Sequence, residues 1–108
     1  MSEVLDKLFN DMTGRYKPNV IEEPISFYFS LGEQEGQKWF LELTPEQAQV
    51  RPGKGDADVF LKTSEDRFLS MIRGEWKPGI MDFMKRTITS NDPLKLQVLK
   101  DCFHKPQI

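Results

Sequence analysis

The chain has 108 residues, of which 38% are hydrophobic and 30% are charged. These proportions are typical of one globular domain and exclude an intrinsically disordered chain, so we expect a single domain over residues 1–108. The formal net charge of −2 argues against a general nucleic-acid-binding protein, because such proteins need a basic face.

The cysteine content and the apolar runs bear on the cellular compartment. Cys102 is the single cysteine, so no disulfide can form within the chain. Residues 1–7 mix acidic and apolar side chains and lack the layout of a secretory signal peptide. No apolar run approaches the roughly 20 residues that cross a bilayer. We therefore expect a soluble cytoplasmic protein.

The first predicted element is a helix. Between Val4 and Met12 the apolar side chains recur at the spacing of one helix face. Ser2 is suited to capping the start of this helix, and Gly14 is suited to ending it. The pattern predicts a helix over residues 4–12.

Strands follow the helix, because apolar and polar side chains begin to alternate. The alternating stretches are residues 25–31, 39–43 and 58–63, with a weaker candidate at 47–51. Glycines flank the polar turn at 32–36, so we expect the first two strands to form an antiparallel hairpin. The whole region is predicted to be an antiparallel meander.

The second half of the chain is mainly helical. Ser64, followed by two acidic residues, predicts the start of a helix, and Gly74 predicts its end. Another helix is expected from Pro78, since proline fits the first helical turn. Its inward face is predicted to carry Ile80, Met81, Phe83 and Met84. A short strand at 87–89 and a terminal helix at 94–103 complete the prediction.

Several motifs in this half resemble the sterol carrier protein type 2 family of lipid-binding domains. They are Ala57-Asp58-Val59-Phe60-Leu61-Lys62 at a strand, Phe68-Leu69, Gly74, Lys77-Pro78 and Phe83-Met84. The order of predicted elements is similar too. The resemblance implies an α+β fold, with a five-stranded, mostly antiparallel sheet that helices cover on one face. Residues 85–92 depart from the family's lysine-rich last strand, so we expect that strand to be short.

Large, pliable apolar side chains form the candidate site. From the residues alone, such a set is most simply a packed core. The resemblance instead implies a lipid-sized cavity between sheet and helices. Its predicted lining is Phe27, Phe29, Trp39, Leu41, Phe68, Ile72, Trp76, Met81, Phe83, Met84, Leu99 and Phe103. The expected ligand is a fatty acid, acyl-CoA, phospholipid or sterol-like molecule, bound without a cofactor or metal and available for transfer.

The terminal helix at 94–103 is the predicted lid over this cavity. Residues 77–108 carry six basic and three acidic side chains, whereas the remaining 76 residues carry nine basic and fourteen acidic ones. This split predicts transient contact of the C-terminal region with an anionic membrane or an acceptor protein. A solvated helix face is the alternative explanation of the same charges.

Catalytic signals are weak. His104 is the single histidine, and its spacing of two residues from Cys102 does not place both on one helix face. The stretch Gly53-Lys54-Gly55 lacks the spacing of a phosphate-binding loop and indicates a turn. We therefore expect no enzymatic activity.

A second hypothesis is a protein-interaction or dimerisation module of the same fold, with a closed core, that assists a lipid- or quinone-related enzyme. Phe40 and Phe60 alternate onto the other face of the sheet, where exposed rings would form an apolar partner surface. A homodimer is one arrangement that this hypothesis allows. The sequence leaves the oligomeric state open.

Overall fold

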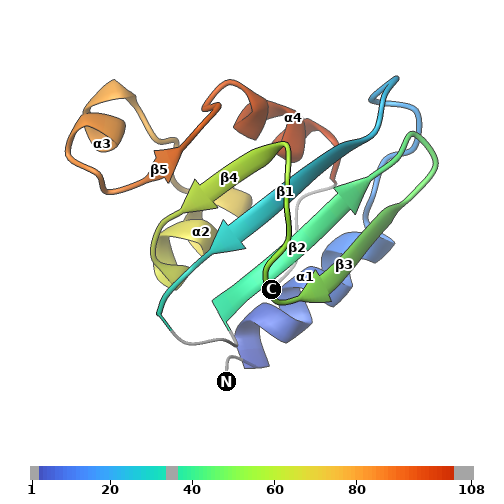
Figure 1. The fold of residues 1–108 in the computed structure, drawn as a ribbon, viewed down its shortest axis with the longest axis horizontal. Coiled ribbons are helices and arrows are strands. Elements are labelled where there is room, and N and C mark those ends of the chain that lie inside the picture. Colours follow the sequence, from blue (N-terminus) through green and yellow to red (C-terminus); the bar gives the residue numbers. More distant parts are fainter. Residues whose placement is uncertain (1–2, 34–36, 104–108) are drawn as a thin grey trace.

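The computed structural model describes residues 3–33 and 37–103 as two layers, a five-stranded sheet with helices on one face (Figure 1). The elements are α1 (Glu3–Gly14), β1 (Ile25–Ser30), β2 (Lys38–Leu43), β3 (Ala48–Pro52), β4 (Val59–Lys62), α2 (Glu65–Ile72), α3 (Ile80–Met84), β5 (Thr89–Ser90) and α4 (Lys95–Asp101). This confirms the predicted fold class, including the weak third strand and the short last strand. The predicted cap Ser2, turn residues 34–36 and His104 lie outside the described residues.

One strand pairing differs from the predicted meander. The strand order is β3-β2-β1-β4-β5, and β1, β2 and β3 pair antiparallel as expected. β4, however, pairs in parallel with β1, so that Phe29 lies opposite Leu61. The meander prediction was wrong because it assumed that strands adjacent in sequence pair, which is usual but did not hold for β3 and β4. Alternation of apolar and polar residues does not by itself show which strands are neighbours.

The connection from β3 to β4 crosses the helix-free face of the sheet, running in front of β2 and β1 in Figure 1. Gly55 in this connection lies against the ring of Phe40, and the Arg51 guanidinium lies 4.3 Å from the centroid of that ring. Phe40 is therefore buried, and the prediction that it is exposed was wrong. Phe60 is half-buried, with its ring centroid 6.0 Å from that of Tyr28.

Local sequence signals set the boundaries of α2 and α3. The Ser64 hydroxyl accepts a hydrogen bond from the backbone N–H three residues on, at 3.3 Å, as the predicted cap requires. Gly74 has a φ of +80°, which favours glycine, and it follows the end of α2. α3 begins at Ile80 rather than at Pro78, and the Asp82 carboxylate accepts a hydrogen bond from the Gly79 N–H at 2.9 Å.

The core lies between the sheet and helices α1, α2 and α4, with an aromatic cluster at its centre. The ring centroid of Phe9 lies 4.8 Å from that of Trp39, 5.6 Å from Phe29 and 5.7 Å from Phe68. These are distances of direct ring packing. The centre of the molecule is therefore formed by the Phe9 ring of α1 and three aromatic side chains that pack on it from β1, β2 and α2.

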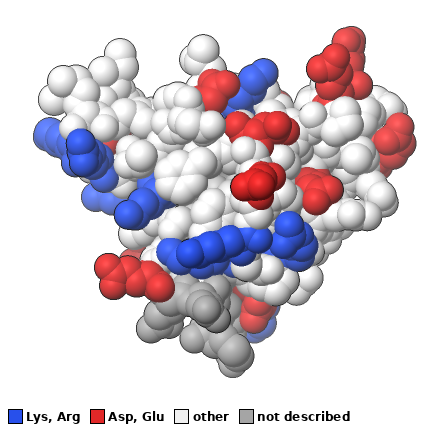
Figure 2. Space-filling model, in the orientation of Figure 1, with Lys and Arg blue, Asp and Glu red and all other residues white. Residues whose placement is uncertain are grey.

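The helix-free face has an uneven distribution of charge. Figure 2 shows Lys and Arg gathered on the left and across the middle of this face, whereas most Asp and Glu lie toward the upper right. Among the described helices, even the longest, the 12-residue α1, is too short and too polar to cross a membrane.

Candidate functional site

The structure divides the twelve predicted cavity residues into three groups. Seven are buried within the core, three are half-buried at its edge, and two are exposed. The buried group is Phe27, Phe29, Trp39, Leu41, Phe68, Leu99 and Phe103; the half-buried group is Ile72, Trp76 and Phe83; and the exposed group is Met81 and Met84. The buried residues belong to one core cluster, in which Phe29, Trp39 and Phe68 pack on Phe9. The sequence placed Phe9 on the α1 stripe but not in the site.

The prediction that Ile80, Met81 and Met84 face the interior was wrong. Their exposed fractions are 79%, 59% and 70%. α3 has only five residues and lies beyond the edge of the sheet in Figure 1, so it has no layer beneath most of its surface. Phe83 is the residue of α3 that turns back to pack against the core. Helical spacing alone does not reveal that a short helix extends past the sheet.

An apolar pocket of about 580 Å3 lies between α3 and the start of α4. Phe83 and Met84 line it from α3, and Leu94, which is 85% exposed, lines it from the other side. We call the exposed apolar residues Ile80, Met81, Met84 and Leu94, together with Phe83, the α3–α4 apolar site. Large exposed apolar side chains gathered in one place mark a binding surface more often than scattered ones do.

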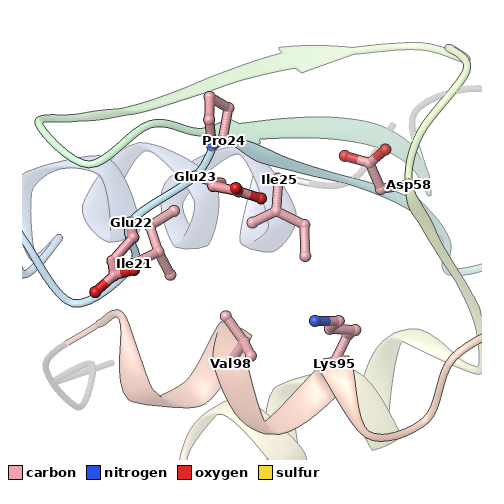
Figure 3. A pocket seen from close by; sticks show the side chains of 8 residues that line it. All are labelled: Ile21, Glu22, Glu23, Pro24, Ile25, Asp58, Lys95 and Val98. Carbon is pink, nitrogen blue, oxygen red and sulfur yellow. The ribbon is translucent and has the colours of Figure 1, made fainter.

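A second pocket, of about 540 Å3, lies on the flank of α4 (Figure 3). In Figure 3, Val98 and Lys95 of α4 lie across the pocket from Ile21 and Ile25, in the segment that leads into β1. Acidic side chains, including Asp58, stand around these apolar residues. α4 is thus bordered by two open pockets, an apolar one beside its start and a second one on its flank that also has charged side chains in its lining.

The two ends of α4 are held very differently. At its C-terminal end, Cys102 and Phe103 are buried, and the Lys17 N–H donates a hydrogen bond of 2.7 Å to the Cys102 carbonyl. The rings of Phe103 and Tyr16 lie 5.4 Å apart, and the Tyr16 hydroxyl donates a hydrogen bond of 2.5 Å to the Thr44 carbonyl. We call these contacts the C-terminal anchor. The N-terminal end begins after the exposed Leu94, beside the open pocket.

The chemistry of Cys102 is that of a buried structural thiol. Burial raises the pKa of this thiol, and the nearby Asp101 raises it further. A raised pKa keeps sulfur in the unreactive thiol form at neutral pH. Within residues 3–33 and 37–103, no group of three or more His, Cys, Asp or Glu side chains is arranged to hold a metal ion.

Comparison with solved structures supports the fold. The stereoselective inverting sec-alkylsulfatase Pisa1 from Pseudomonas sp. contains a similar fold, with a TM-score of 0.78 and 14% identity. That match covers 96% of this chain but only 17% of the alkylsulfatase chain. Sterol carrier protein 2 from Yarrowia lipolytica, in its apo form, matches with a TM-score of 0.50 and 23% identity, over 71% of this chain and 64% of that one.

Comparison at the sequence level identifies the family. No curated protein sequence matches this chain. The model of the SCP-2 sterol transfer family, however, matches residues 5–104, which is nearly the whole length. The chain therefore belongs to the SCP-2 sterol transfer family, as its motifs and its order of elements indicated.

Proposed function

We propose that this chain binds and transfers a lipid-like ligand without catalysis, acting as a single cytoplasmic domain. The ligand class is a fatty acid, acyl-CoA, phospholipid or sterol-like molecule. The observation that carries the proposal is the α3–α4 apolar site, in which exposed residues surround an open pocket that reaches Phe83 at the edge of the core. Membership of a sterol transfer family supports the same ligand class.

In this proposal α4 is a lid that turns about its C-terminal anchor. Lifting its N-terminal end uncovers Leu96 and Leu99, and exposing each buried leucine costs about 1.5–3 kcal/mol. Each methylene of ligand that leaves water contributes about 0.8 kcal/mol. A hydrocarbon of roughly four to eight buried methylenes therefore offsets the opening, since the two effects are then of equal size. A long acyl chain or a sterol supplies more than that.

The predicted ligand contacts follow from this motion. The α3–α4 apolar site receives the ligand first, and the buried members of the predicted cavity, such as Phe68 and Leu99, contact it only after α4 has moved. Basic side chains around α3, including Lys77 and Lys85, would favour transient contact with an anionic membrane during exchange. Specificity would be broad, because a single methylene discriminates weakly.

Displacement of a fluorescent fatty acid tests this proposal. Met84→Glu places a charge in the pocket at an exposed position, so it should weaken fatty-acid binding at least tenfold while the protein stays folded. Val20→Glu is the matched control, since Val20 is an exposed apolar residue away from this pocket. Unchanged binding in a folded Met84→Glu variant, or absence of any extractable lipid and any displacement, would count against the carrier.

A second candidate function is a protein-interaction or dimerisation module of the same fold, with a closed core, that assists a lipid- or quinone-related enzyme. The observation that favours it is the similarity to a segment of an alkylsulfatase chain, together with the closely packed aromatic centre. Light scattering of the purified protein makes the first distinction. A dimerisation module should give twice the monomer mass, whereas a monomeric carrier should give the monomer mass. Lipid extraction followed by mass spectrometry completes the distinction.

A further inference from the structure

The helix-free face carries a row of polar and basic side chains that four strands build together. Ser30 at the end of β1 lies opposite Lys38 on β2 and opposite Lys62 on β4. Lys62 in turn lies opposite Thr89 on β5. Side chains alternate along a strand, and the neighbours Phe29, Trp39 and Leu61 face the core, so this row faces away from the helices.

The row forms one wall of a pocket of about 490 Å3. Arg86 and Thr87, from the connection between α3 and β5, line it as well, together with Thr63 and Ser64 that lead into α2. The pocket therefore lies beyond the carboxyl ends of β1 and β4, the parallel pair of the sheet.

Basic side chains outnumber acidic ones among the described residues that line this pocket. Lys38, Lys62 and Arg86 are basic, and Glu33 is the acidic residue among those that line it. Within the described residues, neither Lys62 nor Arg86 takes part in an ion pair. The Lys38 ammonium donates hydrogen bonds to the Ser30 hydroxyl, at 2.6 Å, and to the Gly32 carbonyl. Both acceptors are uncharged, so they hold the ammonium in place and leave its charge available.

The backbone at Arg86 supports a role for its side chain. Arg86 has a φ of 60°, in the left-handed region that bulky residues seldom occupy. A glycine would adopt this turn without a steric penalty but would lack the guanidinium, which is the side chain best suited to binding a planar or tetrahedral oxyanion through two hydrogen bonds.

We propose that this pocket binds a phosphate or diphosphate group. Three basic side chains supply charge, and the hydroxyls of Ser30, Ser64 and Thr89 supply further donors. The pocket is large enough for a diphosphate. The three basic side chains, Lys38, Lys62 and Arg86, can neutralise the negative charge of that group. The proposal does not rest on lipid binding, because the row lies on the face of the sheet opposite the helices.

Calorimetric titration with inorganic pyrophosphate tests the site. The wild-type protein should bind one pyrophosphate saturably, and Lys62→Gln/Arg86→Gln should weaken binding at least tenfold, since two charge-assisted contacts are lost. Lys54→Gln, alone and combined with Lys7→Gln, is the control, because the pair removes the same two positive charges from exposed positions outside the pocket. All the variants should keep the thermal unfolding midpoint of the wild type, since the altered side chains are exposed.

Two further arms locate the site and separate the sources of the phosphate. In NMR spectra, pyrophosphate should shift the backbone amides of Ser30, Thr63 and Thr87. Vesicles containing phosphatidic acid, compared with pure phosphatidylcholine vesicles, show whether the group belongs to a lipid. Binding to the acidic vesicles that pyrophosphate competes away indicates a lipid headgroup, and pyrophosphate binding without vesicle binding indicates a free phosphorylated molecule. No saturable pyrophosphate binding, or an equal loss in Lys7→Gln/Lys54→Gln, overturns the proposal.

Discussion

Gly55 lies so close to Phe40 that a Cβ atom at position 55 would stand 2.5 Å from the Cδ2 atom of the ring. The same Cβ would stand 2.8 Å from the Arg51 guanidinium, which itself lies over the Phe40 ring. This contact holds the β3–β4 connection against the sheet, and the connection is what allows β4 to reach its parallel partner β1.

Gly55→Val is therefore expected to destabilise the protein by about 1–3 kcal/mol, because it overpacks a closed contact. Urea unfolding measures the change. Gly14→Ala is the matched control, since nothing lies within 4 Å of a Cβ at that position. Its effect should be close to zero or slightly stabilising, because alanine favours helices over glycine. Equal stabilities of Gly55→Val and wild type would show that the connection moves freely off the sheet.

Phe9→Ala should be among the most damaging single substitutions in this chain. The ring contacts Trp39, Phe29 and Phe68 and is fully buried, so its removal leaves a large cavity. The expected loss is about 3–5 kcal/mol of unfolding free energy. Leu94→Ala, at an exposed position, should change stability by less than about 0.5 kcal/mol. A mild effect of Phe9→Ala would mean that the aromatic cluster collapses around the gap.

The C-terminal anchor should limit how fast the buried Cys102 thiol reacts. Tyr16→Ala removes the ring that packs on Phe103, so the end of α4 should open more often. Reaction of Cys102 with a thiol reagent should then be at least tenfold faster than in the wild type. In the carrier function, the same variant should also release a bound fatty acid faster. An unchanged rate of thiol reaction would show that α4 is held elsewhere.

Stability should also fall at alkaline pH. Burial raises the pKa of the Cys102 thiol and, together with the charge of Cys102, that of Tyr16. Since each group holds its proton more tightly when folded, stability is full below the ordinary pKa values and is lost as the pH rises through the folded ones. The urea midpoint should therefore be flat near neutral pH and decline above about pH 9.

Cys102→Ala separates the thiol from the phenol in that decline. The variant should lose the first part of the alkaline decline, and Tyr16→Phe should lose the later part, because the phenol ordinarily titrates above the thiol. Each variant is compared with its own midpoint at pH 7, so that any loss of packing cancels. A midpoint for the wild type that stays constant up to pH 11 contradicts the burial of these groups.

Local patterns in the sequence predicted most of the elements. Ser64 and Gly74 bounded α2 because a cap hydroxyl and a left-handed glycine act on the residues beside them. Alternation placed Phe27, Phe29 and Leu41 on the inner face of the sheet, and the departure at residues 85–92 predicted a short β5. These signals depend on neighbours within a few positions, which the chain order itself supplies.

The candidate site was harder to predict, because exposure depends on what lies opposite a side chain. Met81 and Met84 have the spacing of a buried helix face, yet α3 extends past the sheet and leaves them in solvent. Phe40 alternates onto the outer face, yet the β3–β4 connection covers it.

The sequence by itself determined the order and type of the elements and the family to which the chain belongs. Tertiary structure alone decided that β4 lies beside β1, and with it that Lys38, Ser30, Lys62 and Thr89 share one row. The reason is physical: periodicity records which face a side chain occupies, whereas strand partnership arises from the burial and hydrogen bonding of segments far apart in the chain.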